Sequence, residues 1–246
     1  MRPLVNQPES ADVEQARQET ERSAAMIARA IRAGMNIPDT LFDALLEYEH
    51  RSRSAMFWTP VAVACEVARW LAHFGARSVL DVGSGVGKFA VLSALAQGEL
   101  TVFGVEHRAS LVRAARTLAQ EFALDARVHF IEGEYASAPL PHCDALYLFN
   151  PFGENLFDDG EQIDDSVTRS FDRFREDSRA VTAQLKRAPI GALFCTYNGF
   201  GGKLPQSFDL LRHSDEHRCP LRLWRKRTMF ADGPDMLEED LALRGR

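Results

Sequence analysis

The fold of this chain is decided by residues 79–89, which read Val79-Leu80-Asp81-Val82-Gly83-Ser84-Gly85-Val86-Gly87-Lys88-Phe89. An apolar strand pattern over residues 78–82 runs into three spaced glycines, and a helical pattern starts at Lys88. Glycine lets the backbone turn tightly and lets a ligand approach the main chain. In open α/β sheets, ligands bind beyond the carboxyl ends of the strands. We therefore expect a cofactor loop between this strand and this helix.

Strand and helix patterns alternate along the rest of the chain, which is typical of a parallel sheet covered by helices on both faces. Two last strands with no helix between them indicate an antiparallel hairpin at the sheet edge. The sequence thus predicts an α/β fold with a seven-stranded, mostly parallel, Rossmann-like sheet. The expected strands are 78–82, 101–106, 128–131, 144–149, 190–197, 208–211 and 221–225, and the expected helices are 88–97, 110–122 and 165–187.

Three helical patterns precede the first strand. The first covers 11–35, and the second follows Asp39 or Thr40 as its cap. The third has Thr59 as its cap and Pro60 at its first position, and it ends near Gly75. We expect three parts: a helical extension or lid over 1–76, an α/β domain over 77–228 and a C-terminal tail over 229–246.

Composition excludes several classes of protein. The chain has 246 residues, 46% of them hydrophobic, and a formal net charge of −6. We find no apolar run long enough to span a membrane and no secretory signal pattern, so we expect a cytoplasmic protein with no membrane partner. The four cysteines form no paired motif, so we expect no structural zinc and no metal site. A net negative charge makes a large nucleic-acid partner less favoured.

The pattern Asp81-x-Gly83-x-Gly85-x-Gly87 resembles the first motif of class I S-adenosylmethionine (SAM) dependent methyltransferases, and the resemblance extends over most of residues 78–227. Its spacing differs from the GxGxxG fingerprint of dinucleotide-binding sites, which disfavours an NAD-dependent oxidoreductase. Polar groups follow the next three strands in the order that the family shows. They are Glu106, then Gly133-Glu134-Tyr135, then Asn150-Pro151-Phe152-Gly153.

The resemblance implies SAM as the cofactor. It places the methionine part of SAM against the glycine loop and its ammonium group near Asp81. It implies that Glu106 binds the ribose hydroxyls and that the turn after the third strand binds adenine. The cofactor-binding residues expected on this basis are Asp81, Gly83, Ser84, Gly85, Gly87, Glu106, His107, Glu134, Tyr135 and Thr59. The alternatives are that Asp81 caps a turn, that Glu106 is a solvated loop acid, and that Thr59 only starts a helix beside a packed Trp58.

The fourth strand end suggests the chemistry. Asn150-Pro151-Phe152 partly resembles the Asn/Asp-Pro-Pro-aromatic motif of amino-group methyltransferases, which implies that Asn150 accepts hydrogen bonds from the target nitrogen. The motif here has one proline, so the register of Phe152 is shifted. A weaker local resemblance links the glycine loop and Gly104-Val105-Glu106 to non-SET lysine methyltransferases. We take Asn150, Pro151 and Phe152 as the catalytic candidates; the alternative is a strand end with Phe152 in the core.

Two charged stretches leave the acceptor open. Nine acids between Glu154 and Asp177 could form a rim for a cationic substrate, or could favour a helix N-terminus. The arginines over 212–227 could bind phosphate, or could protect a solvated edge strand. We expect methyl transfer to nitrogen of a protein side chain or small amine. The alternatives are a non-catalytic SAM-binding regulatory module, a nucleic-acid N-methyltransferase and an aminopropyl transferase.

Overall fold

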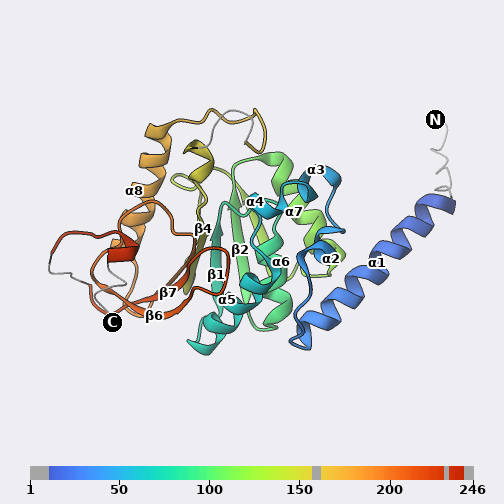
Figure 1. The fold of residues 1–246 in the computed structure, drawn as a ribbon, viewed down its shortest axis with the longest axis horizontal. Helices are drawn as coiled ribbons and strands as arrows, with labels where there is room; N and C mark the ends of the chain where they lie inside the picture. The colour runs from blue at the N-terminus through green and yellow to red at the C-terminus, as the bar shows by residue number, and fades with distance from the viewer. Residues whose placement is uncertain (1–10, 157–161, 230–232, 241–246) are drawn as a thin grey trace, which may run out of the picture.

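A seven-stranded sheet in the order β3-β2-β1-β4-β5-β7-β6 forms the centre of the molecule. The computed structural model describes residues 11–156, 162–229 and 233–240. Strands β1 to β5 pair in parallel. Strand β7 is antiparallel to both β5 and β6, so β6 runs in the direction of β5. The expected seven-stranded, mostly parallel sheet is therefore confirmed, together with the antiparallel pair at its end (Figure 1).

The elements follow one another in the expected alternation. They are α1 (Ala11–Arg32), α2 (Asp39–Asp43), α3 (Tyr48–Arg51), α4 (Ser54–Phe57), α5 (Val61–His73), β1 (Ser78–Val82), α6 (Lys88–Ala96), β2 (Thr101–Glu106), α7 (Ala109–Glu121), β3 (Val128–Glu132), β4 (Ala145–Phe149), the 3-10 helix η1 (Gly153–Leu156), α8 (Phe171–Arg187), β5 (Leu193–Tyr197), β6 (Phe208–Ser214) and β7 (Leu221–Lys226).

The two faces of the sheet bury separate sets of side chains, because successive strand residues point to opposite faces. On β1, Val79 belongs to the core under α5, α6 and α7, and Leu80 belongs to the core under α8. Figure 1 shows α8 on the opposite side of the sheet from those helices. Both faces are thus closed, and the carboxyl ends of the strands remain available for a site.

Several element boundaries differ from the sequence expectation, and four of them differ by three residues or more, among them the end of β6 at Ser214 rather than at 211. Helix α8 begins at Phe171 rather than at 165, because the Ser170 side chain caps it by accepting the Arg173 N–H at 3.1 Å. Strand β5 begins at Leu193, after Gly191 with φ 92°. The helix expected over 11–35 ends at Arg32. A side-chain cap sets the start of α8 and a left-handed glycine precedes β5, while Gly34, with φ 74°, follows the end of α1.

The expected cap at Thr59 was wrong. Pro60 is the N-cap residue of α5, and the Val61 N–H donates to Asp39 Oδ1 at 2.9 Å. Thr59 is buried, with its hydroxyl 2.9 Å from the Tyr147 hydroxyl on β4. Asp39 caps α5 rather than its own helix, for which no side-chain cap hydrogen bond forms. A residue remote in sequence therefore does the capping that local spacing had assigned to Thr59.

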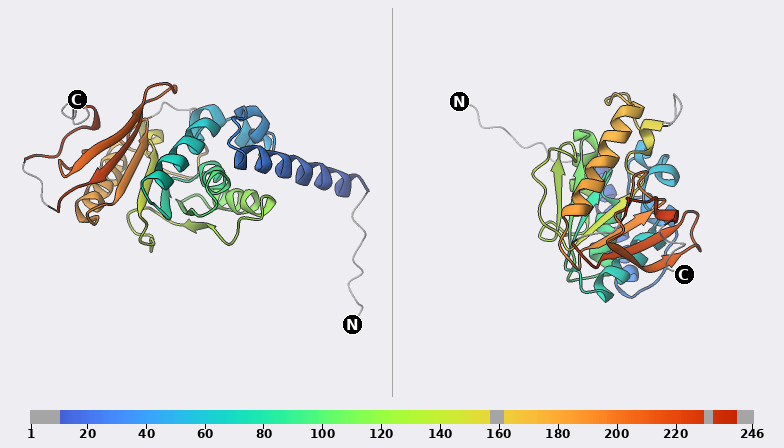
Figure 2. Two further views of the ribbon diagram at one scale, coloured as in Figure 1. Left: turned by 90° about the horizontal axis from the view of Figure 1, so that it is seen from below. Right: turned by 90° about the vertical axis from the view of Figure 1, so that its left-hand side faces the viewer.

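One buried lysine after the glycine loop binds three side chains of the N-terminal helices. Lys88 is 2% exposed, and its Nζ lies 2.6 Å from Asp39 Oδ1, 2.7 Å from Asp43 Oδ1 and 3.1 Å from Ser54 Oγ. All three partners precede the sheet in sequence. Further out, the second half of α1 packs on α6, while its first half extends away from the body (Figure 2). No helix among the described residues is long and apolar enough to cross a membrane.

The edge of the sheet is formed by β6, and β7 lies inside it. The expectation that the 212–227 arginines protect an edge strand is therefore wrong for those on β7. Arg225 lies 4.9 Å above the Phe74 ring, and the buried Lys226 donates to the Leu185 and Lys186 carbonyls at the end of α8. These cations stabilise packing and a helix C-terminus, which favours positive charge.

Candidate cofactor and acceptor site

Three glycines after β1 adopt left-handed backbone angles, with φ 70° at Gly83, 53° at Gly85 and 76° at Gly87. A Cβ at Gly85 would lie 2.3 Å from the Trp58 ring, and a Cβ at Gly83 would lie 2.8 Å from Pro151 Cβ. The loop therefore needs glycine for both its angles and its close contacts. It is held between the α4–α5 segment and the turn after β4.

Asp81 is a buried carboxylate beneath this loop. It is 4% exposed, and its Oδ2 has no hydrogen-bond partner among the described residues. Burial, and next the nearby Glu106 charge, raise the pKa of Asp81 well above its usual range. A buried polar atom without a partner is costly, and such groups in native proteins call for an explanation. A cationic group of a bound ligand would supply the missing partner.

Glu106 holds the loop from the end of β2. Its Oε2 accepts the Gly85 N–H at 3.1 Å, and its Oε1 accepts the Arg108 N–H at 2.9 Å. Each carboxylate oxygen can accept a second hydrogen bond, so both remain able to bind hydroxyls. His107 Nδ1 lies 3.4 Å from Oε1, and its Nε2 has no partner among the described residues.

A cavity of about 280 Å³ opens at the carboxyl ends of the parallel strands. Eight of the thirteen predicted site residues line it: Gly83, Glu106, His107, Glu134, Tyr135, Asn150, Pro151 and Phe152. The other five, namely Asp81, Ser84, Gly85, Gly87 and Thr59, lie behind the lining or away from it. The sheet thus brings the four strand ends together as the sequence predicted.

The turn after β4 has strained geometry. Asn150 has φ 38°, an uncommon angle for a residue other than glycine, although asparagine tolerates it best. Its N–H donates to the Gly199 carbonyl at 3.1 Å, and its carbonyl accepts the Gly153 N–H at 3.0 Å. Among the described residues its side-chain amide makes no hydrogen bond. Such outliers cluster at functional sites.

Two side chains of the turn after β3 already make polar contacts with helix α8. Glu134 pairs with Arg173 of α8, and the Tyr135 hydroxyl donates to the Gln184 side chain. Burial raises the pKa of Tyr135 above its usual range. Phe152 is 7% exposed, and its ring centroid lies 6.3 Å from that of Tyr135. Phe152 therefore both packs in the core and lines the cavity.

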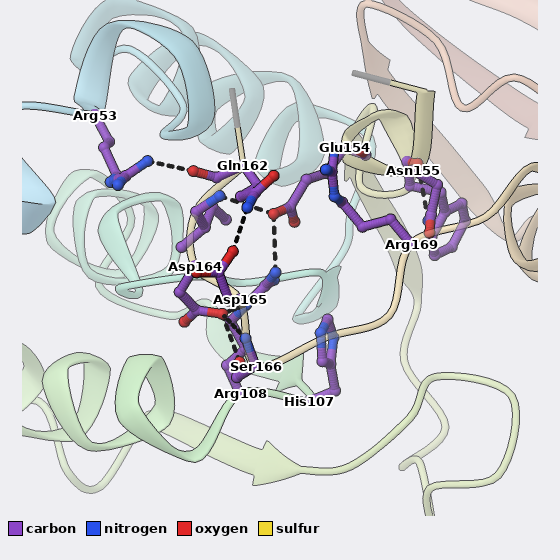
Figure 3. A network of polar contacts seen from close by, with 12 residues as sticks. Arg53, His107, Arg108, Glu154, Asn155, Gln162, Asp164, Asp165, Ser166 and Arg169 are labelled. Carbon is purple, nitrogen blue, oxygen red and sulfur yellow. Dashed lines mark hydrogen bonds and ion pairs between the residues drawn. The ribbon is translucent and has the colours of Figure 1, made fainter. Parts of the chain in front are cut away.

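The acidic stretch after Asn150 is largely paired (Figure 3). The buried Arg108 guanidinium binds Glu154 Oε1 at 2.9 Å and Asp164 Oδ1 at 3.0 Å. Arg53 donates to the Gln162 carbonyl from the N-terminal side. Segment 162–166 is thus held between the N-terminal helices and α7. The predicted acids Asp158, Asp159 and Glu161 lie outside the described residues.

Sequence reasoning missed several cavity residues. Asn198 follows β5 with φ 63°, and its position matches that of Asn150 after β4. A polar residue after an apolar strand could have identified it. Asp177, the last acid of the stretch expected as a rim, and Arg173 face the cavity from α8, and burial raises the pKa of Asp177. Arg218, one of the arginines expected over 212–227 as a phosphate patch or a solvated edge, reaches the cavity from the β6–β7 loop together with Cys219, which no local pattern marked.

Comparison with known proteins gives a family match and a set of similar folds. Residues 52–139 match the sequence model of the protein-L-isoaspartate(D-aspartate) O-methyltransferase family. The matched region contains the glycine loop and ends before β4, so the cavity residues contributed by β4 and by later elements lie outside it. No curated protein matches the chain.

Two solved structures with TM-scores above 0.5 share the fold of this chain. TrmN from Thermus thermophilus is 16% identical, with a TM-score of 0.53 over 72% of this chain and 53% of that one. An O-methyltransferase family 2 protein from Planctomyces limnophilus, in complex with apigenin, is 13% identical, with a TM-score of 0.52 over 76% and 66%. An RNA methyltransferase from Salinibacter ruber, in complex with S-adenosyl-L-homocysteine, is 17% identical, with a TM-score of 0.49 over 72% and 95%. The chain thus spans about half of TrmN and two thirds of the Planctomyces protein.

The strand order and the two solved structures with TM-scores above 0.5 show the Rossmann-like fold, which confirms the predicted fold. The family model that matches residues 52–139 is that of a methyltransferase family, in agreement with the predicted enzyme class. The family match covers β1 to β3 with the glycine loop, whereas the turn after β4, helix α8, the end of β5 and the β6–β7 loop line the cavity outside the matched residues.

Proposed function

We propose that this protein transfers the methyl group of SAM to a nitrogen nucleophile held beside Asn150. The observation that carries the proposal is the buried Asp81 Oδ2, which has no hydrogen-bond partner within the described part of the chain and lies beneath a glycine loop that contacts Pro151. A buried acid suits the ammonium of SAM, and the contact between Gly83 and Pro151 joins the cofactor loop to the acceptor turn. Residues 77–228 form the methyltransferase domain in this proposal, and the helices before them form its cover.

Each residue then has a defined task. Asp81 neutralises the ligand ammonium, and Glu106 keeps the glycine loop in place while offering lone pairs to ribose hydroxyls. Glu134 and Tyr135 border the adenine end. When bound, SAM supplies a methyl group on a sulfonium, which leaves as a neutral thioether. The protein has to position the acceptor and exclude water.

Asn150 is the residue that positions the acceptor. Its left-handed backbone and the Gly153 contact fix its side-chain amide at the cavity, where the amide oxygen can accept an N–H. When the Asn150 amide oxygen accepts this N–H, the lone pair of the acceptor nitrogen points away from Asn150 and toward the methyl group. Phe149 and Tyr197, whose ring centroids lie 4.7 Å apart, give the cavity aromatic walls. Such walls favour a flat acceptor.

The pairing of acids with Arg108 removes one reason for expecting a cationic amine. Glu154 and Asp164 are already neutralised. A protein side chain or small amine remains an acceptor that the Asn150 geometry suits, and a nucleobase nitrogen suits it as well.

The test is transfer of labelled methyl from SAM to four acceptor pools: peptides, polyamines, nucleosides and total RNA. We expect incorporation into a nitrogen-bearing acceptor. Asn150→Ala should lower kcat by about 10²-fold, typical of losing one positioned hydrogen-bonding group, with SAM affinity unchanged. Asn36→Ala, an exposed asparagine before α2, is the matched control and should keep full activity. Equal activity of Asn150→Ala and wild type would exclude the assigned role.

A further inference from the structure

A second, basic groove lies beside α8 and outside the cavity described above. It is lined by one acid, Asp235, and by the cations Arg175, Arg179, Lys186 and Lys203. Its volume is about 570 Å³. The chain as a whole carries a net charge of −6, so four cations around one groove are a local reversal of charge. We name this feature the α8 groove.

The groove has a fixed floor. The Thr182 hydroxyl donates to the Lys203 carbonyl at 2.8 Å, and the Ser178 hydroxyl lies 3.4 Å from the Phe200 carbonyl as its donor. A Cβ at Gly201 would lie 2.3 Å from the Phe174 ring. The loop after β5 is therefore joined to α8 by two hydroxyl groups and one close glycine contact, so the cations project from a defined surface.

Helical periodicity directs the charges of α8 to two separate sites. Arg175, Arg179 and Lys186 are spaced by four and seven residues and share one face of the helix. Arg173 and Asp177 lie on another face and line the methyl-transfer cavity. One helix thus separates the two hollows, and the β5–β6 loop contributes Asn198 to the cavity and Gly201 to the groove. Three residues span at most about 11 Å, so the two hollows are near neighbours.

The groove cations are largely unneutralised. Lys186 pairs with Asp235 at 2.6 Å, whereas Arg179 and Lys203 have no ion-pair partner among the described residues. Arg175 lies 5.8 Å from the centre of the Phe171 ring, and that ring is 60% exposed. A row of cations with an exposed aromatic ring at its end is typical of surfaces that bind single-stranded nucleic acid, where phosphates follow the cations and a base stacks on the ring.

We propose that the α8 groove binds the phosphodiester backbone of a single-stranded nucleic acid and thereby delivers a nucleobase nitrogen to Asn150. Arg175, Arg179 and Lys203 contact phosphates, and Phe171 stacks on a base. This substrate class rests on the methyl transfer proposed above, but binding in the groove does not depend on it. The overall acidity of the chain is compatible with the proposal because attraction between exposed charges acts over about 8 Å in physiological salt.

Binding is tested without cofactor, by fluorescence anisotropy with labelled single-stranded RNA and DNA of about 12 nucleotides at several salt concentrations. The triple variant Arg175→Gln, Arg179→Gln, Lys203→Gln should bind at least tenfold more weakly. Its slope of log affinity against log salt should be shallower by about 2, since each phosphate contact contributes about 0.7. Phe171→Ala should weaken binding about tenfold without changing the slope.

The control is a second triple variant with the same loss of charge on exposed helix positions elsewhere, Arg22→Gln, Arg29→Gln and Arg113→Gln. It should bind within about twofold of wild type. Equal affinity of the two triple variants would overturn the proposal, as would binding of polyglutamate as tight as that of RNA. If the groove binds but no nucleic acid accepts methyl while another acceptor does, the methyl-transfer proposal stands and the delivery role fails.

Discussion

Substitution of the buried Lys88, which follows the glycine loop, should destabilise the packing of the N-terminal helices against the domain. In Lys88→Met the two carboxylates of Asp39 and Asp43 lose the cation that lies 2.6 and 2.7 Å from them. The Asp39 side chain is 45% exposed and can be hydrated, whereas the Asp43 side chain is 9% exposed. Loss of one partner of a buried ion pair costs about 3–5 kcal/mol, because the buried charge left behind, here that of Asp43, is uncompensated. At roughly 2–4 °C per kcal/mol for a chain of this size, the Tm should fall by about 6–20 °C.

The assays are thermal unfolding and urea unfolding, both followed by circular dichroism, with Lys203→Met as a control at an exposed lysine. The double variant Lys88→Met, Asp43→Asn should be less destabilised than the sum of the single variants, since the residues are in contact. A loss below about 1 kcal/mol in Lys88→Met, the range of surface pairs, would refute the reasoning, and so would strict additivity.

Two further predictions concern the glycine loop and the C-terminal residues. Gly85→Ala places a Cβ 2.3 Å from the Trp58 ring, so calorimetry should show SAM binding weakened at least tenfold, whereas Gly98→Ala, with open space around it, should bind normally. Glu238 is buried, and burial raises its pKa from 4.5 to about 7, so its stabilising contribution is full below pH 4.5 and is lost as pH rises to 7. Glu238→Gln should therefore gain about 2–3 kcal/mol over wild type between pH 5 and pH 8 in urea unfolding; a pH-independent difference would show that this carboxyl does not titrate.

The strand ends could be predicted because their signals are local. The glycines between 83 and 87 encode backbone angles that other residues rarely adopt, and an acid or asparagine after an apolar strand marks the edge where parallel strands meet. These features located Glu106 and Asn150 correctly at the cavity. Which of the site residues bind cofactor remains a prediction.

The long-range contacts could not be predicted in the same way. Asp39 accepts the N–H of Val61, 22 residues away, and thereby caps α5. Arg108 binds Glu154 and Asp164, which lie 46 and 56 residues further along the chain. Nothing in the spacing of those acids distinguishes a paired segment from an open acidic rim. The α8 groove was missed because its cations lie on two elements, α8 and the β5–β6 loop, that only folding brings together.

Calorimetric titration with SAM and S-adenosylhomocysteine tests the central claim most directly, with Asp81→Asn as the variant and Asp125→Asn, in the loop after α7, as the control. We predict micromolar-scale binding of both ligands by wild type and control. Asp81→Asn should remain folded and bind at least tenfold more weakly, because it loses the charge that faces the ammonium. Equal affinity in Asp81→Asn, or no binding by folded wild type, would contradict the assignment of this site to SAM.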